Sequence, residues 1–344
     1  MSRLRKVLIF SSIALTTAVL LVLGMVFSKT EEEKVNWLAE AYDVSEAGDL
    51  VFVKYNKGVA EIYQNTDGKV EFIVSLQAEK ELLDITFTPS GSELVFSTTD
   101  WEYERLVSDV QSINLDTFEM ELLFQLDGLV TEIQFDPKDE QKLYYLLAAT
   151  NESYSPIAKA HPHDFDIYHV DLSTKKHFMH TNLKQYSMRS LQVSAEKEAI
   201  YVQMDDESQD EFDEGYGESK QRIFELPLEP TEEMIVLSDV EREADVFDFS
   251  LVEGEEAIVF QSIANYNSGD IFEYELYYYD LERKEEEALT NLASYVSRPV
   301  VVEAENKIYF MVNDNFGKSE IPDRSICSID MDGDNLREIN VTNE

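Results

Sequence analysis

The sequence predicts an all-β protein made of repeated four-stranded units, and three observations support this. A motif of strand, tight turn and strand recurs six times within residues 39–344. A second hairpin follows each copy of the motif, so each unit supplies four antiparallel strands. The chain also holds 18 tyrosines and 19 phenylalanines against only 12 glycines, a composition typical of β-rich folds.

Residues 85–96 give the clearest copy of the motif. Apolar side chains alternate with threonine over residues 85–88, the period of two that is typical of a strand. Pro89 fixes its own φ angle and Gly91 accepts a positive φ angle, which predicts a tight turn between them. Residues 93–96 then resume an apolar strand that ends in phenylalanine.

The other copies align on this second strand, which ends in an aromatic residue each time. The aligned segments are residues 50–52, 94–96, 143–145, 199–201, 258–260 and 308–310. Four antiparallel strands recurring roughly every 45–60 residues are typical of a β-propeller. The sequence therefore predicts a six-bladed β-propeller of four-stranded antiparallel blades.

Three stretches also resemble a known family. Residues 87–96 resemble the F-S-P-D-G-x-x-I-x-F repeat of TolB-like propellers, and residues 279–291 and 329–336 resemble that family's turn between the third and fourth strands. The resemblance covers residues 39–343. It implies a propeller with WD-like β-propeller repeats that is used mainly to bind other proteins.

The N-terminus predicts a membrane anchor. Residues 7–27 contain no charged side chain, and as a helix they would span roughly 32 Å, enough for a bilayer core. Arg3, Arg5 and Lys6 precede this run and acidic residues follow it, so the positive-inside rule places the N-terminus in the cytoplasm. A cleaved signal peptide and a buried helix are the alternatives.

These observations divide the chain into four parts. Residues 1–6 are the expected cytoplasmic N-terminus, residues 7–27 a single transmembrane signal anchor and residues 28–38 a linker. Residues 39–344 are the expected propeller domain, extracytoplasmic and held at the cell membrane. The only cysteine, Cys327, excludes an intramolecular disulfide and is expected in the core.

The charge balance excludes one class of partner. The chain has 70 acidic against 28 basic residues, a net charge of −42. Such a surface repels the phosphate backbone of DNA and RNA, so no nucleic-acid partner is expected. It attracts cations or basic proteins instead.

Loop lengths indicate which face of the propeller binds a partner. The loops between the second and third strands of the units emerge on one face, and five of the six are long. Binding residues concentrate in long loops on a rigid scaffold, although tolerated insertions are the alternative. The candidate partner-binding residues are Trp101, Tyr103, Tyr154, His161, His163, Tyr266 and Phe316.

No catalytic or cofactor motif is present. His161, His163 and Asp164 are too few for a metal site on their own. The acidic residues 205–218 leave Ca²⁺ open as a ligand, but they lack the ordered spacing of a calcium-binding loop. The sequence has neither a Gly-x-Ser-x-Gly nucleophile elbow nor a glycine-rich phosphate loop, so we expect no catalytic residues, cofactor or metal.

Three functional hypotheses follow. The first is a non-enzymatic, membrane-anchored protein-binding module of the cell envelope. The second is a hydrolase or lyase with a metal- or carboxylate-lined site at the propeller channel. The third is a structural acidic coat domain. Polar residues converging from several blades at the channel would favour the second.

Salt should stabilise this protein. Four of the 28 basic residues precede residue 30, so residues 30–344 hold 24 basic and 70 acidic side chains, a net charge of −46. Added salt screens the repulsion among these acids, and the melting temperature should rise. Thermal unfolding at increasing NaCl concentration measures this. A melting temperature independent of salt would show that the acids are already paired or neutralised.

Overall fold

A computed structural model of the chain describes residues 16–17, 36–100, 106–150, 162–206, 219–229, 234–252, 254, 256–268, 271–318 and 321–342. The predicted anchor, residues 7–27, lies outside these ranges apart from residues 16 and 17. Within the ranges, no helix has both the length and the apolar character needed to cross a membrane.

The described residues form 24 strands, consistent with the predicted spacing of hairpins. The first twelve are β1 (Leu38–Val44), β2 (Leu50–Asn56), β3 (Val59–Thr66), β4 (Lys69–Ser75), β5 (Lys80–Phe87), β6 (Glu93–Asp100), β7 (Val107–Asn114), β8 (Met120–Asp127), β9 (Leu129–Asp136), β10 (Asp139–Thr150), β11 (His163–Asp171) and β12 (Lys176–Met179).

The second half of the chain repeats the pattern with shorter outer strands. Its strands are β13 (Met188–Ser194), β14 (Ala199–Asp206), β15 (Lys220–Pro227), β16 (Ile235–Val236), β17 (Val246–Val252), β18 (Ala257–Ile263), β19 (Tyr274–Asp280), β20 (Glu285–Ala288), β21 (Tyr295–Val302), β22 (Lys307–Asn313), β23 (Arg324–Asp330) and β24 (Arg337–Glu338). A 3₁₀ turn, η5 (Glu303–Glu305), joins β21 to β22.

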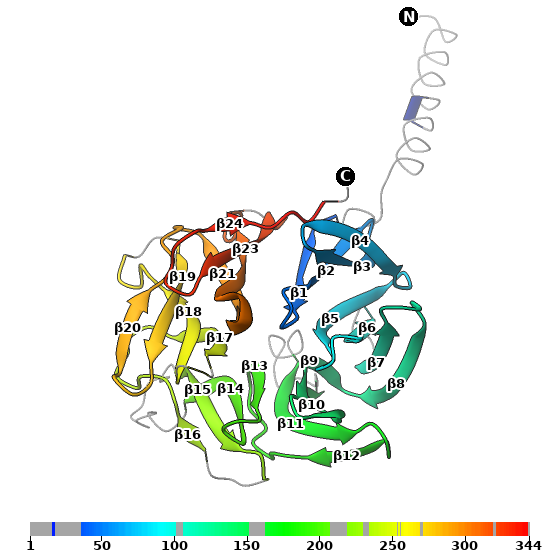
Figure 1. Cartoon of the computed structure of the whole chain (residues 1–344), viewed down its shortest axis with the longest axis horizontal. Helices are drawn as coiled ribbons and strands as arrows, with labels where there is room; N and C mark the ends of the chain where they lie inside the picture. Colours follow the sequence, from blue (N-terminus) through cyan, green and yellow to red (C-terminus); the bar gives the residue numbers. More distant parts are fainter. Residues whose placement is uncertain are drawn as a thin grey trace, which may run out of the picture.

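Consecutive strands pair into four-stranded antiparallel sheets, which are β1–β4, β5–β8, β9–β12 and β13–β16. The last eight strands count as one sheet because a parallel pair, Tyr274 with Tyr295, links β19 to β21. On each side of that pair lie four consecutive antiparallel strands. Figure 1 shows the groups arranged in a ring, with the first strand of each group nearest the centre. The predicted all-β architecture of four-stranded antiparallel units is confirmed.

The core lies between neighbouring groups of strands. The aromatic residue that ends each second strand is at most 3% exposed; these are Phe52, Phe96, Tyr145, Tyr201, Phe260 and Phe310. One cluster, for example, joins Tyr42 and Leu50 of the first group to Tyr309 and Ile326 of the last. Cys327 is 8% exposed within another cluster, as the sequence predicted.

The ring closes through side chains and the C-terminal tail. Each group contains only consecutive strands, so among the described residues no strand is exchanged between the two ends of the chain. Instead, Ile339 and Val341 pack against the first group. The Asn65 side-chain amide donates a hydrogen bond to the Asn340 carbonyl at 2.7 Å, and the Arg324 guanidinium donates one to the Leu38 carbonyl at 3.1 Å.

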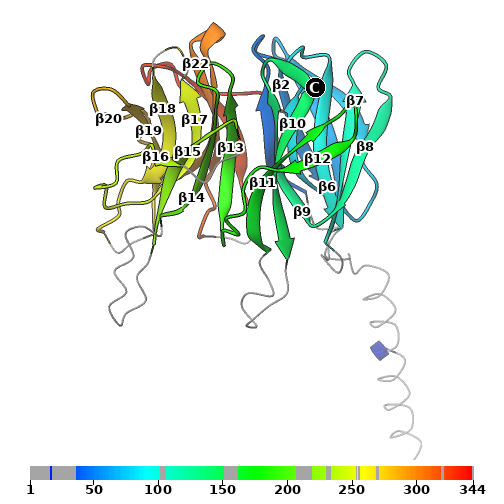
Figure 2. The same cartoon turned by 90° about the horizontal axis from the view of Figure 1, so that it is seen from below.

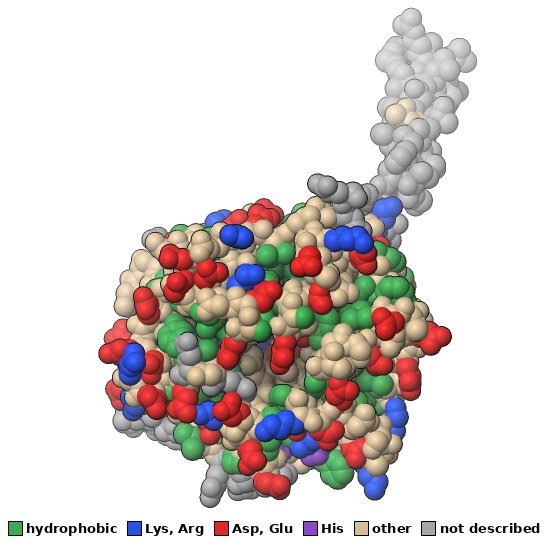
Figure 3. Space-filling model, viewed as in Figure 1, with side chains coloured by type: hydrophobic (Ala, Val, Ile, Leu, Met, Phe, Trp, Pro, Cys, Tyr) green, Lys and Arg blue, Asp and Glu red, His purple; other side chains and the backbone are tan. Residues whose placement is uncertain are grey.

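Antiparallel pairing sorts the connections onto two faces (Figure 2). Turns from first to second and from third to fourth strands share one face, called here the short-turn face. Loops from second to third strands share the other, the long-loop face. Since β1 starts where its neighbour β2 ends, the chain enters the ring at Leu38 from the long-loop face. Acidic side chains are spread over the face of the ring seen in Figure 3.

Burial of the motif aromatics should dominate the stability of the fold. Phe96 is 0% exposed, so Phe96→Ala should lower the free energy of unfolding by about 3–5 kcal/mol. Leu122→Ala is the control, since Leu122 is 54% exposed and its truncation should cost less than about 1 kcal/mol. Urea unfolding of the full-length chain measures both. Equal costs would show that the repeat is wrongly phased.

Candidate functional site

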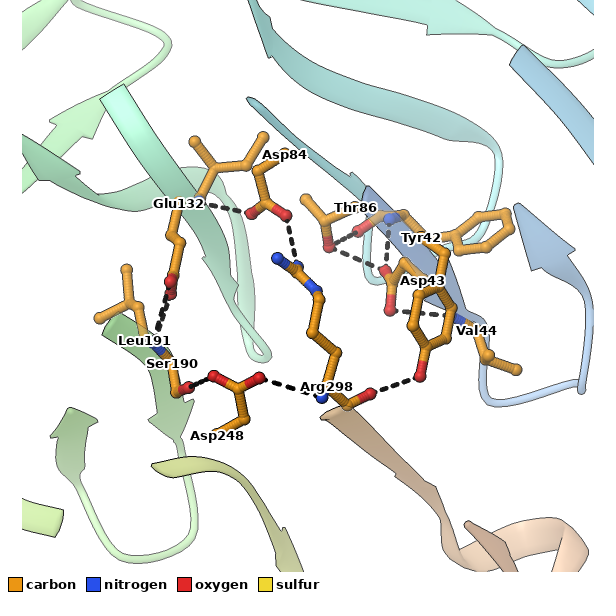
Figure 4. A network of polar contacts seen from close by, with 12 residues as sticks. Tyr42, Asp43, Val44, Asp84, Thr86, Glu132, Ser190, Leu191, Asp248 and Arg298 are labelled. Atoms are coloured by element: carbon orange, nitrogen blue, oxygen red, sulfur yellow. Dashed lines mark hydrogen bonds and ion pairs between the residues drawn. The ribbon is translucent and has the colours of Figure 1, made fainter. Parts of the chain in front are cut away.

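A ring of polar side chains lies at the centre of the molecule (Figure 4). The pairing register between each group's first and second strands shifts at least once, a sign of a β-bulge, which re-aims side chains. In or beside these bulges are Asp43, Asp84, Glu132, Ser190, Asp248 and Arg298. Polar residues from all groups of strands thus converge at the centre.

These side chains bond one group of strands to the next. The Asp43 carboxylate on β1 accepts the Phe87 N–H of β5 at 2.9 Å. The Asp84 carboxylate on β5 in turn accepts the Ile133 N–H of β9 at 3.0 Å. Each first strand therefore satisfies backbone N–H groups on the open edge of its neighbour, which have no partner in their own sheet.

The same pattern continues around the ring. The Glu132 carboxylate on β9 accepts the N–H groups of Ser190 and Leu191 on β13, at 2.9 and 2.7 Å. The Ser190 hydroxyl donates to Asp248 on β17 at 3.3 Å, and Asp248 accepts the Arg298 N–H on β21 at 3.1 Å. Two further bonds link neighbouring groups beside this ring. The Gln192 side chain accepts the Leu251 N–H and the Ser250 hydroxyl accepts the Val301 N–H, both at 3.0 Å.

Arg298 closes the ring in two ways. Its carbonyl accepts a hydrogen bond from the Tyr42 hydroxyl, which links β21 back to β1. Its guanidinium reaches across the centre to Asp84, with Nη2 and Oδ1 2.9 Å apart. Burial works against the guanidinium charge, but Asp84, Glu132 and Asp248 outweigh it and hold the pKa of Arg298 above its ordinary value.

Burial raises the pKa of three central carboxylates, those of Asp43, Asp84 and Glu132. It raises the pKa of Glu132 to about 7, and the neighbouring Asp84 charge adds to this effect. Burial likewise raises the pKa of Asp43 to about 6 and the pKa of Asp84 above its ordinary value. Because each of these carboxylates already accepts backbone hydrogen bonds, the arrangement holds the ring together. Within the described ranges, no group of three or more His, Cys, Asp or Glu residues is placed to hold a metal ion.

A cavity of about 420 Å³ opens on the long-loop face. It lies between the loop joining β18 to β19, called here loop 5 (residues 264–273), and the loop joining β22 to β23, called here loop 6 (residues 314–323). Its lining residues are Ile271, Phe272, Glu273, Ala293, Ser294, Tyr295, Asn313, Phe316 and Lys318.

The described residues of loops 5 and 6 make matching hydrogen bonds. In each, the first residue's N–H bonds the carbonyl nine positions on, at 2.9 and 3.0 Å. In each, an asparagine amide also bonds the carbonyl of an isoleucine six positions on, from Asn265 to Ile271 at 2.9 Å and from Asn315 to Ile321 at 3.4 Å. The described residues of the two loops therefore correspond, with Tyr266 of loop 5 matching Phe316 of loop 6.

These matched positions carry an exposed apolar patch. Tyr266 and Phe316 are 42% and 38% exposed, Ile271 and Ile321 are 54% and 62% exposed, and Phe272 is 42% exposed. We call these five residues the loop patch. Contiguous exposed apolar side chains are typical of interaction surfaces, so the loop patch is a candidate for one.

Aromatic stacking beneath loop 6 holds the patch in place. Phe316 stacks on Tyr295 with ring centroids 3.9 Å apart and meets Tyr274 edge-on at 5.6 Å. Tyr274 and Tyr295 are the residues whose parallel pairing joins β19 to β21. The patch is therefore fixed to the seam between the last two groups of strands.

The predicted partner-binding residues separate into three sets. Tyr266 and Phe316 lie in the loop patch. His163 differs from the expectation of an exposed loop residue: it begins β11, is 5% exposed and packs its ring 6.1 Å from that of Tyr186, so it offers little surface. The remaining four, Trp101, Tyr103, Tyr154 and His161, lie outside the described residues.

Sequence reasoning missed Ile271, Phe272 and Ile321. The signal that points to them is the repeated spacing of asparagine, aromatic residue and isoleucine in two successive loops. It also missed the central ring, whose members lie about 50 residues apart along the chain.

Comparison with known proteins supports the fold. No family model and no curated protein matches the sequence. Among solved structures, TolB from Acinetobacter baumannii is similar with a TM-score of 0.56 at 14% identity, covering 83% of this chain and 60% of that one. An oligogalacturonate lyase in complex with manganese gives 0.57 at 14%, covering 88% and 77%. A chain of a nidogen/laminin complex gives 0.55 at 8%, covering 82% and 89%.

These similarities establish a β-propeller-like fold and nothing finer, because every identity is far below the level at which function carries over. This chain also spans only 60% of the TolB structure.

The stability contributed by Glu132 should depend on pH. Its folded pKa of about 7 exceeds the ordinary value of 4.5, so the folded protein favours the protonated form. The contribution is full at a pH below the ordinary value and is lost as the pH rises through the folded pKa. Between about pH 8 and about pH 5, the wild type should therefore gain unfolding free energy relative to Glu132→Gln.

Urea unfolding across this pH range measures the difference. Glu121→Gln, which removes a carboxylate from an exposed position of β8, controls for the change in net charge and should keep the wild-type pH dependence. Parallel curves for wild type and Glu132→Gln would contradict the raised pKa.

Proposed function

We propose that this protein is a non-enzymatic protein-binding module that captures a partner through the loop patch on its long-loop face. The observation that carries the proposal is the pair of matched loops, which hold Tyr266, Ile271, Phe316 and Ile321 exposed. Of these four, Ile271 and Phe316 line the cavity. Aromatic and large apolar side chains beside a pocket dominate the energetics of protein interfaces. One structure with a similar fold is a chain of a nidogen/laminin complex, which is a protein complex.

The proposal includes a six-bladed ring anchored to a membrane. Counting the eight-stranded sheet as two blades joined by one residue pair gives six blades. The uncharged run at residues 7–27 supports a single signal anchor with the ring outside the cytoplasm. Since the chain enters the ring from the long-loop face, the linker residues before β1, 28–37, at most about 36 Å long, would hold that face toward the membrane.

The alternative of a hydrolase or lyase at the channel finds less support. Polar residues do converge at the centre, as that hypothesis requires. However, the carboxylates of Asp84, Glu132 and Asp248 already accept hydrogen bonds from backbone N–H groups, and Asp84 also pairs with the Arg298 guanidinium. These contacts give the ring a structural role, so we assign no reaction to it.

Cross-linking tests the proposed face. A photoreactive amino acid at position 266 of the full-length protein in its native membranes should yield an adduct with a second protein. Ile271→Ala combined with Ile321→Ala should reduce the adduct at least about tenfold, because apolar contacts at the centre of an interface are lost. The adduct is measured by immunoblotting.

Leu122→Ala is the matched control, because Leu122 on β8 is 54% exposed like Ile271 but lies on an outer strand. It should leave the adduct unchanged. If a photoreactive residue at position 122 captured the same protein as efficiently as one at position 266, the assignment of the binding face would be wrong.

A further inference from the structure

We propose that the loop patch recognises an extended segment of a partner protein in which bulky apolar side chains are flanked by lysine or arginine. This inference rests on the proposed function and specifies the chemistry of the partner. It follows from a feature of loops 5 and 6 that protein binding in general does not require, a free carboxylate at the end of each loop.

Each loop ends in an acidic residue at the matched position, Glu273 in loop 5 and Asp323 in loop 6. The backbone of both is fixed, since the Glu273 N–H bonds the Asn265 side chain at 2.9 Å and the Asp323 N–H bonds the Asn313 side chain at 3.1 Å. Neither carboxylate accepts a hydrogen bond or forms an ion pair with any residue in the described ranges. Both are therefore available to a ligand.

The surroundings of the cavity favour a cation. Glu273 lines the cavity beside the aromatic rings of Phe272, Tyr295 and Phe316. A carboxylate next to aromatic faces suits an ammonium or guanidinium group, which gains from both. Lys318 also lines the cavity, but its ammonium donates to the Asp314 carbonyl at 3.0 Å. The net charge of the whole chain, −42, attracts a basic partner over a longer range.

The backbones of the two isoleucines in the loop patch are held in place before a partner binds. The asparagine clamps of Asn265 and Asn315 hold the backbone of Ile271 and Ile321, so these side chains are presented without a loss of loop entropy on binding. The described residues of the two loops place an aromatic residue, an isoleucine and a carboxylate at matching positions, which makes two similar subsites. A segment that alternates apolar and basic side chains fits this pair.

A lipid surface is the rival occupant, because aromatic and isoleucine side chains also enter membrane interfaces. Two observations favour the peptide. The free carboxylates of Glu273 and Asp323 would repel anionic headgroups. Three residues of the loop patch, Ile271, Phe272 and Phe316, also line a cavity, and a cavity fits a single side chain better than it fits a flat bilayer surface.

Binding of defined peptides to the full-length chain in lipid nanodiscs tests the inference by calorimetry. The probe is an acetylated, amidated peptide of about eight residues that alternates phenylalanine and arginine. It should bind, and salt should weaken the binding. Glu273→Gln combined with Asp323→Asn should weaken the affinity at least about tenfold, through lost charge pairing.

Matched variants and peptides decide the outcome. Glu282→Gln combined with Asp67→Asn removes the same two residue types from exposed turns on the short-turn face and should leave the affinity unchanged. A glycine–arginine peptide that bound equally well would refute the apolar requirement. A phenylalanine–glutamate peptide that bound equally well would refute the role of the carboxylates.

Failure of this inference is distinguishable from failure of the proposed function. If no peptide bound while the adduct from position 266 persisted, protein binding would stand and the basic, apolar segment would be wrong. If no peptide bound and a polarity-sensitive dye on Tyr266→Cys shifted to the blue in nanodiscs, the patch would belong to lipid. Cys327 is buried and does not compete for the dye.

Discussion

The structure depends on how the innermost edge of each group of strands finds hydrogen-bond partners. An edge strand buried at the centre of a ring exposes backbone N–H groups that have no strand beside them. Leaving one buried and unpaired costs about 1–3 kcal/mol. Here a side chain of one group accepts the N–H of the next, as Asp84 does for Ile133 and Glu132 does for Leu191. The same contacts that satisfy the backbone therefore bind the groups to one another.

This solution imposes an electrostatic constraint. Acceptors aimed at N–H groups are best supplied by carboxylates, but several carboxylates brought together repel one another. The Arg298 guanidinium offsets this at the centre by pairing with Asp84. Burial and, to a smaller extent, the Asp84 charge still raise the pKa of Glu132 to about 7. The stability of the ring should therefore vary with pH. The loop patch is attached to this ring through the stacking of Phe316 on Tyr295.

The sequence predicts the parts of the fold that depend on neighbours in the chain. The strand at residues 85–87, the turn at Pro89 and the burial of Phe96 follow from local chemistry, and the structure confirms them. The alternation of apolar residues with threonine does not mark an exposed face, because Thr86 is buried as well. The central ring is different, because each member is a single polar residue within a strand and its partner lies about 50 residues away. A weak signal does exist, since Asp84 and Glu132 each stand three positions before a buried phenylalanine. The exposure of Ile271 was equally hard to predict, because the loop backbone there is set by a hydrogen bond from the Asn265 side chain to the Ile271 carbonyl.

Acidic residues in this molecule thus occupy two environments with different consequences. The carboxylates at the centre accept hydrogen bonds from backbone N–H groups, and Asp84 pairs with Arg298, so these carboxylates stabilise the ring. Glu273 and Asp323 lie at the ends of two matched loops and accept no bond from the described residues, although their backbones are fixed. Fixing a charged group without pairing it adds nothing to the fold. Under the proposed recognition, a cation from another molecule that entered the cavity would gain from Glu273 beside Phe316 and Tyr295.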